Sequence, residues 1–126
     1  MEDKKQIIFS ISNVILGSWI RIREIHWNTT NQAKHQLTDS ILWRLVSTMD
    51  SIVEITSGIY DEKIGFNVLK PVIPNTNDLK QILKACSMKI ESYCGMLNDP
   101  AFNGLRAEID EFQADVNKWI YLSDNN

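Results

Sequence analysis

Apolar residues recur at helical spacing through long stretches of this chain, and this pattern constrains the fold more than any other feature. The first stretch, residues 4–28, carries a stripe made of Ile7, Ile8, Ile11, Val14, Ile15, Ile22 and Ile25. The same spacing returns in three later segments, and only three prolines and five glycines interrupt the 126 residues. The sequence therefore predicts an all-α chain that folds as one domain over residues 1–126, with helices at about 4–28, 33–57, 77–97 and 100–122.

The connection between the second and third helices is predicted to be the only long one. Gly58 is placed to end the second helix, and Thr76 or Asn77 is placed to cap the third. Between them, residues 59–76 contain a glycine and two prolines, which exclude a long helix. A short helical turn fits there, and the apolar residues of this segment are expected to pack against the helices.

The start of the fourth helix is marked by Asp99 followed by Pro100, an N-terminal carboxylate and then a proline at the first helical position. Asn103–Gly104 forms helix poorly and can delay that start. The connections before the second and fourth helices are short, so each of these helices runs antiparallel to its predecessor. The expected fold is an antiparallel four-helix bundle with a long connection in its middle.

The first two helices carry more apolar surface than one core requires. A second apolar sector on residues 4–28 consists of Phe9, Leu16, Trp19 and Ile20, and the face of the second helix is widened by Leu42, Trp43, Val46 and Val53. A helix that is apolar on two sides is buried on two sides. In a domain of this size, that pattern favours self-association.

Charge and cysteine content narrow the class of protein. A net charge of -3 provides no general attraction for nucleic acid or an anionic membrane. No apolar run reaches the roughly 18 residues that span a bilayer. Cys86 and Cys94 lie about 12 Å apart along one predicted helix, which forbids a disulfide between them within a subunit. A reduced, cytoplasmic protein is therefore expected.

Four polar residues share one quadrant of the second predicted helix: His35, Asp39, Asp50 and Glu54. Asp50 and Glu54 are spaced i,i+4, which places two like charges side by side at a cost of a few tenths of a kcal/mol. A bound cation would turn this cost into a gain. Acidic pairs of this kind are nevertheless mostly solvated helix surface, so spacing alone leaves that interpretation open.

The rise of the helix separates these residues into two groups. Asp39 and Asp50 are eleven residues apart, which is roughly 16 Å along the axis, whereas metal–ligand bonds are near 2 Å. The groups can meet only if a second copy of the helix runs antiparallel to the first, as in a two-fold homodimer. Each of two equivalent sites would then hold His35 and Asp39 from one chain, with Asp50 and Glu54 from the other.

A further histidine can join this site. His26 lies near the end of the first predicted helix and faces the same short loop as His35. Mixed histidine and carboxylate ligands suit iron, manganese or zinc rather than calcium.

The same residues resemble a known family. The pattern begins with IREIHWN, continues with a histidine and an aspartate four residues apart, and ends with DSIVE. It is similar to the pattern of the Dps family, the mini-ferritins. The residues concerned are His26, Trp27, Asn28, His35, Asp39, Asp50 and Glu54. Near the C-terminus, Lys118 and Trp119 look like the closing segment of that family. The resemblance covers residues 7–58 well and the last helix loosely.

The resemblance implies a ferritin-like four-helix bundle with a ferroxidase site between two-fold-related subunits. It implies that His26 of one chain binds iron with Asp50 and Glu54 of its mate, and that His35 and Asp39 hold a weaker second iron or its bridging water. The implied reaction is oxidation of Fe(II) by peroxide or oxygen, followed by mineral storage in a shell of twelve subunits.

The sequence departs from the family pattern at several points. The spacing from His26 to His35 is a few residues shorter, and the small helix that the family places between the second and third helices is reduced or missing. Val53–Glu54–Ile55 replaces the family's Ala-Glu-Arg, and there is no lysine-rich tail. These changes weaken the expectation of a twelve-subunit shell and of DNA binding. They weaken the expectation of a dimer site less.

A second function remains open on the same scaffold. The chain can be a non-catalytic interaction protein, an adaptor or an inhibitor, in which the metal site is vestigial. Its partner would then contact the broad apolar faces that include Trp19 and Trp43. The sequence therefore does not decide whether the chain is an enzyme. Nucleophilic catalysis has no support, because neither cysteine lies near a histidine in the sequence.

Overall fold

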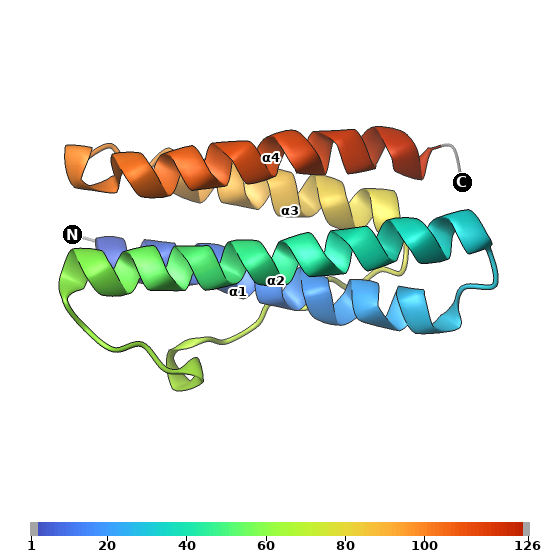
Figure 1. Ribbon diagram of the computed structural model, residues 1–126, viewed down its shortest axis with the longest axis horizontal. Helices are drawn as coiled ribbons and strands as arrows, with labels where there is room; N and C mark the ends of the chain where they lie inside the picture. The colour runs from blue at the N-terminus through green and yellow to red at the C-terminus, as the bar shows by residue number, and fades with distance from the viewer. Residues whose placement is uncertain (1–2, 125–126) are drawn as a thin grey trace.

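The computed structural model describes residues 3–124, which form four α-helices and two 3-10 turns (Figure 1). The elements in chain order are α1 (Lys4–Asn28), α2 (Gln32–Tyr60), η1 (Phe66–Val68), α3 (Leu79–Cys94), η2 (Pro100–Phe102) and α4 (Asn103–Ser123). No strand occurs within residues 3–124. The predicted all-α four-helix bundle is confirmed. The predicted domain also includes residues 1–2 and 125–126, which lie outside the described residues.

The four helices pack in a closed square. α1 packs against α2 and α3, and α4 packs against the same two helices. Figure 1 shows that the connection after α2 returns along the bundle, so α3 runs in the same direction as α2 and antiparallel to α1 and α4. A bundle with one long crossover of this kind has ferritin-like connectivity.

The core follows the predicted apolar stripes. Every member of the α1 stripe is buried, and Phe112 of α4 is the largest of the side chains that are completely buried. Burying such side chains contributes roughly 1.5–3 kcal/mol each, which is why the periodic pattern decides the arrangement of the helices. None of the helices formed by residues 3–124 combines the length and apolar character that a membrane span requires.

Helix ends differ from the predictions where local side chains decide them. The expectation that Gly58 ends the second helix is wrong, because α2 continues to Tyr60 and is capped by Asp61, whose φ of 52° is left-handed. Ile59 and Tyr60 pack against the core and so extend the helix past the glycine. Asp78 caps α3 by accepting a hydrogen bond from the Gln81 N–H, in place of the predicted Thr76 or Asn77.

The other two differences are small. Asp99 does cap a helical start, but the helix it caps is η2, and α4 begins at Asn103. α3 ends at Cys94, three residues before the predicted end.

The connecting segment, residues 61–78, lies against α1 rather than projecting from it. The Lys70 N–H donates to Asn13 Oδ1 at 2.7 Å, and the Val72 N–H donates to the Asn13 carbonyl at 3.2 Å. Further along, Arg21 Nε donates to the Pro74 carbonyl at 2.8 Å. Between these bonds the segment crosses Gly17, where an added Cβ would collide with the Val72 carbonyl group. Only glycine permits this close crossing.

The apolar residues of the connecting segment pack less fully than predicted. Leu69 packs against the core, but Phe66 is 75% exposed, and Val72 and Ile73 are also exposed. The segment is held mainly through its backbone. This leaves Phe66 at the surface beside α2.

Candidate metal centre

The structure brings the two histidines of the chain together. Asn31 caps α2 by accepting a hydrogen bond from the Lys34 N–H, so the chain reverses direction within residues 29–31. The last turn of α1 therefore faces the first turn of α2. The rings of His26 and His35 lie with their centroids 4.0 Å apart at an interplanar angle of 31°. His26 is half-buried and His35 is exposed.

Thr38 orients the ring of His26. Its Oγ1 lies 3.0 Å from His26 Nδ1 and also 2.9 Å from the Lys34 carbonyl and 3.1 Å from the His35 carbonyl. A hydroxyl carries one proton, and a backbone carbonyl can only accept. In the Nδ1–H tautomer of His26, Oγ1 accepts from Nδ1–H and gives its own proton to one of the two carbonyls. That tautomer is the one that leaves the lone pair of Nε2 to bind a metal.

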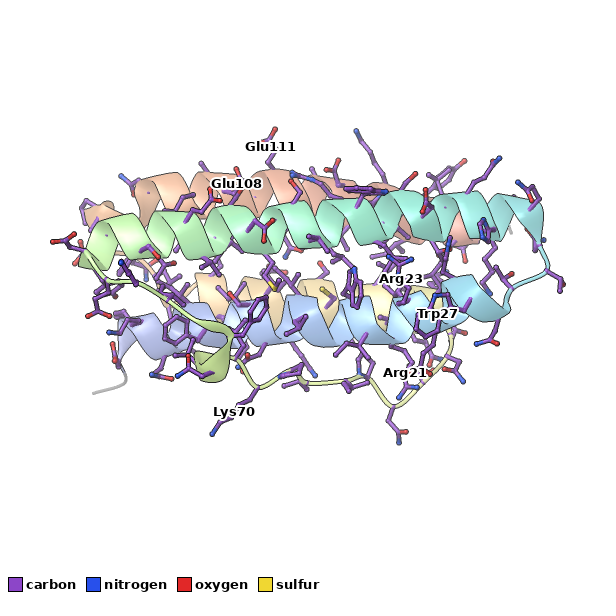
Figure 2. The ribbon with its side chains drawn as sticks, turned by 60° about the horizontal axis from the view of Figure 1, so that its bottom comes forward. Arg21, Arg23, Trp27, Lys70, Glu108 and Glu111 are labelled. Atoms are coloured by element: carbon purple, nitrogen blue, oxygen red, sulfur yellow. The ribbon has the colours of Figure 1, made fainter. Side chains whose placement is uncertain are left out.

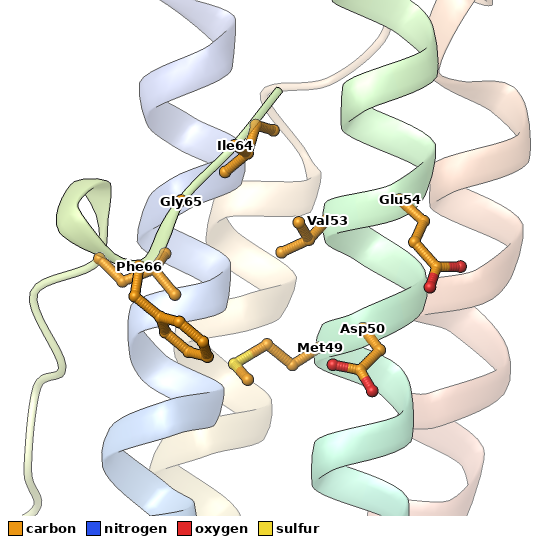
Figure 3. A pocket seen from close by; sticks show the side chains of 8 residues that line it. Met49, Asp50, Val53, Glu54, Ile64, Gly65 and Phe66 are labelled. Atoms are coloured by element: carbon orange, nitrogen blue, oxygen red, sulfur yellow. The ribbon is translucent and has the colours of Figure 1, made fainter. Parts of the chain in front are cut away.

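The three carboxylates of the predicted site lie on the exposed side of α2. Asp39 is exposed one turn beyond His35, and Asp50 and Glu54 are exposed further along the helix. Figure 3 shows the side chains of Asp50 and Glu54 one turn apart and directed to the same side of α2. Among residues 3–124, none of the three carboxylates takes part in a hydrogen bond or ion pair. Their negative charge is thus uncompensated within one copy.

The described residues of one copy do not by themselves make a complete site. Within residues 3–124, no three side chains of His, Cys, Asp or Glu lie close enough together to hold a metal ion. The structure places His26 and His35 together and leaves Asp50 and Glu54 further along α2. The predicted ligand set, with a second copy supplying the missing half, stays a prediction.

A pocket of about 180 Å³ lies next to the acidic pair (Figure 3). The connecting segment forms one wall and α2 forms the other. The apolar lining consists of Met49, Val53, Ile64, Phe66 and Leu69, and Asp50 and Glu54 also line it. Sequence reasoning missed this pocket because it depends on how the connecting segment lies against the helices. It also missed Thr38, whose spacing from the histidines matches no familiar pattern.

The two cysteines contribute no further chemistry. Cys86 and Cys94 are free, buried thiols. Burial raises the pKa of the Cys86 thiol to about 11, and burial likewise raises the pKa of Cys94. Both thiols are therefore protonated at neutral pH, whereas a nucleophile or metal ligand is a thiolate.

Comparison with protein-family models, with curated proteins and with solved structures gives no match for this chain. Its function must therefore be inferred from the geometry of its own residues.

Proposed function

We propose that two copies of this chain pair to form a mini-ferritin-like iron site that binds and oxidises Fe(II). The observation that carries the proposal is the histidine pair. His26 and His35 come from different helices, and their ring centroids lie 4.0 Å apart. Thr38 contacts Nδ1 of His26, so Nε2 is the ring nitrogen left to bind a metal. A metal-binding histidine usually gives its other ring N–H to such a hydrogen-bond acceptor.

The pairing is inferred from the positions of the ligands on α2. In a two-fold pair of antiparallel α2 helices, a single register sets His35 opposite Glu54 of the other copy and also Asp39 opposite Asp50. Each copy therefore contributes half of each of two equivalent sites. His26, which contacts His35, joins the half supplied by its own chain.

The charges of this arrangement favour a divalent transition metal. Asp50 and Glu54 repel one another on α2 and form no ion pair with the described residues of their own copy, and a metal ion would reverse the sign of that interaction. Imidazole and carboxylate together suit iron, with manganese and zinc as competitors. In the proposed reaction, two Fe(II) ions each give one electron to a peroxide molecule, whose O–O bond breaks to give two hydroxide ions.

Anaerobic titration with Fe(II) tests the proposal directly. We expect saturable binding, followed on addition of peroxide or oxygen by the absorbance of Fe(III). Asp50→Ala and Glu54→Ala should lose both signals. Loss of an outer hydrogen-bond partner alone costs about 10–100-fold in metal affinity, so loss of a direct ligand should cost at least as much.

Glu111→Ala is the control, because it removes an exposed helical carboxylate from α4, a helix that carries none of the predicted ligands. It should titrate as the wild type does. If the wild type binds no Fe(II), or if all three variants behave as it does, the iron function is wrong even though the fold is ferritin-like in its connectivity.

A non-catalytic interaction protein is the second candidate. The observation that favours it is Trp43, which is 73% exposed on α2. Large exposed aromatic side chains are enriched in protein interfaces. The iron titration separates the two functions, because an interaction protein with a vestigial site should show no saturable Fe(II) binding.

A further inference from the structure

We propose that Trp27 of each copy inserts into the pocket beside Asp50 and Glu54 of the other copy. The inference rests on the two-fold pairing of the proposed function and assigns an occupant to the pocket. It makes the connecting segment, through Phe66, a part of the interface between the two copies.

In the proposed dimer, Trp27 of one copy and the pocket of the other lie at the same position along the helix axes. Because His26 contacts His35, the end of α1 is level with the beginning of α2. In the register that sets His35 opposite Glu54, the neighbouring Trp27 is level with Glu54 of the other copy. That glutamate lines the pocket, so the indole lies level with the pocket as well.

Trp27 and the pocket also lie on the same side of the paired bundles. A two-fold axis that relates two antiparallel α2 helices keeps α1 of both copies on the same side of the helix pair. Figure 2 shows Trp27 on the α1 side of α2, and the connecting segment runs along the same side of the bundle. The part of that segment that lines the pocket, residues 64–69, lies beside residues 49–54 of α2, toward the end opposite Trp27. Two-fold pairing therefore brings the Trp27 end of one copy to the pocket end of the other, twice per dimer.

The Trp27 end of one copy and the pocket end of the other are complementary in apolar character and in charge. Trp27 is 70% exposed, although its side chain is large and mostly apolar. The pocket is lined mainly by apolar side chains and has a volume of about 180 Å³. Arg23, one turn before Trp27 on α1, lies over the ring of Trp19 at 5.1 Å and brings positive charge to this end of the face. Asp50 and Glu54 bring negative charge to the other end.

A disulfide between copies tests the arrangement. Within one copy, positions 27 and 66 lie on the order of 25 Å apart along the bundle axis, which excludes an intramolecular bridge. Between copies the proposal places them side by side. We expect the double variant Trp27→Cys/Phe66→Cys to form a covalent dimer under mild oxidation, seen by non-reducing electrophoresis. Both native side chains are mostly exposed, so the substitutions should preserve the fold.

The single variants are the controls. Trp27→Cys alone and Phe66→Cys alone place their thiols at opposite ends of the paired helices and should not cross-link. The native cysteines are buried. Equal cross-linking of single and double variants, or none in the double variant, would overturn the proposal.

A second measurement uses no added cysteine. Trp27→Ala should raise the dimer dissociation constant by at least about tenfold in sedimentation equilibrium, as expected for an aromatic anchor in a pocket. Met88→Ala removes a side chain that is 71% exposed on α3 and should leave the constant unchanged. Equal constants for Trp27→Ala and wild type would contradict the insertion.

These results separate the two proposals. A covalent dimer that binds no Fe(II) would leave the Trp27 contact intact and remove the iron function. Fe(II) binding that depends on Asp50, without the cross-link, would leave the iron function and remove the Trp27 contact.

Discussion

The hydroxyl of Thr38 lies 3.0 Å from His26 Nδ1, and its part in the proposed iron site can be tested by one substitution. Thr38→Val keeps the shape of the side chain but removes the hydroxyl that contacts His26 Nδ1. The ring is then free to rotate or change tautomer, so we expect Fe(II) affinity to fall by about 10–100-fold. Isothermal titration under anaerobic conditions measures the change.

Thr48→Val is the matched control for this prediction. Thr48 is buried in the same helix, and its Oγ1 has no hydrogen-bond partner among the described residues. Its replacement should leave Fe(II) affinity unchanged, and removing an unpaired buried hydroxyl is neutral or stabilising. Equal losses of affinity in both variants would mean that Thr38 acts through packing rather than through His26.

Sequence reasoning at the residue scale succeeds where helix geometry alone decides the outcome. The 3.6-residue period places Asp50 and Glu54 on an exposed side of α2, as Figure 3 shows. The contact of Thr38 with His26 crosses between helices and depends on the path of residues 29–31. No pattern local to the sequence encodes that path, so the role of Thr38 emerges only in three dimensions.

At the scale of elements, the connecting segment shapes the pocket and depends on one glycine. An alanine at Gly17 would collide with the Val72 backbone, so the segment must move off α1 and weaken its hydrogen bonds to Asn13. Overpacking of this kind costs about 1–3 kcal/mol. We expect Gly17→Ala to lower the free energy of unfolding by that amount and to speed proteolysis within residues 61–78.

Gly58→Ala is expected to change the free energy of unfolding in the opposite direction. Gly58 lies within α2, and an added Cβ meets nothing within 4 Å. Alanine should therefore stabilise the helix by about 0.5–1 kcal/mol in chemical denaturation. If both variants shift the free energy of unfolding in the same direction, the close crossing at Gly17 is not what holds the segment.

The two glycines also show why element boundaries were harder to predict than the elements themselves. Long apolar stripes identify α1 and α2 because burial repeats over many turns. The end of α2 is decided instead by Ile59 and Tyr60, which pack against the core beyond Gly58. Whether a glycine ends a helix depends on how the next residues pack in three dimensions, and the sequence pattern does not contain that packing.

At the scale of the whole molecule, the sequence is enough to predict the bundle, whereas the metal site stays a prediction. Four periodic segments and one long connection lead to the observed architecture. The same helix geometry requires that His35 and Glu54 of one chain stay apart, and residues 3–124 contain no complete metal cluster. In the proposed dimer the missing half of the site lies on another copy. A single sequence indicates that pairing only because His35 and Asp39 of one copy complement Asp50 and Glu54 of the other.

That requirement makes metal binding and self-association a single linked equilibrium. If each site takes ligands from two copies, a metal ion binds the dimer and not the separate chains, so it must favour the dimer by mass action. At a free metal concentration of about 100 times its dissociation constant, each site contributes about 2.7 kcal/mol to dimer stability. Adding Fe(II) anaerobically should therefore shift the sedimentation-velocity mass from one chain toward two at protein concentrations near the dimer dissociation constant.

Removal of the metal by a chelator should reverse the shift, and Asp50→Ala should show no shift at any metal concentration. Magnesium, which prefers an all-oxygen shell, should have little effect at the same concentration. A mass near twelve chains would extend the pairing to the closed shell implied by the family resemblance. Saturable Fe(II) binding at a constant mass of one chain would place the site within a single copy, and the intersubunit pairing of His35 with Glu54 would then be wrong.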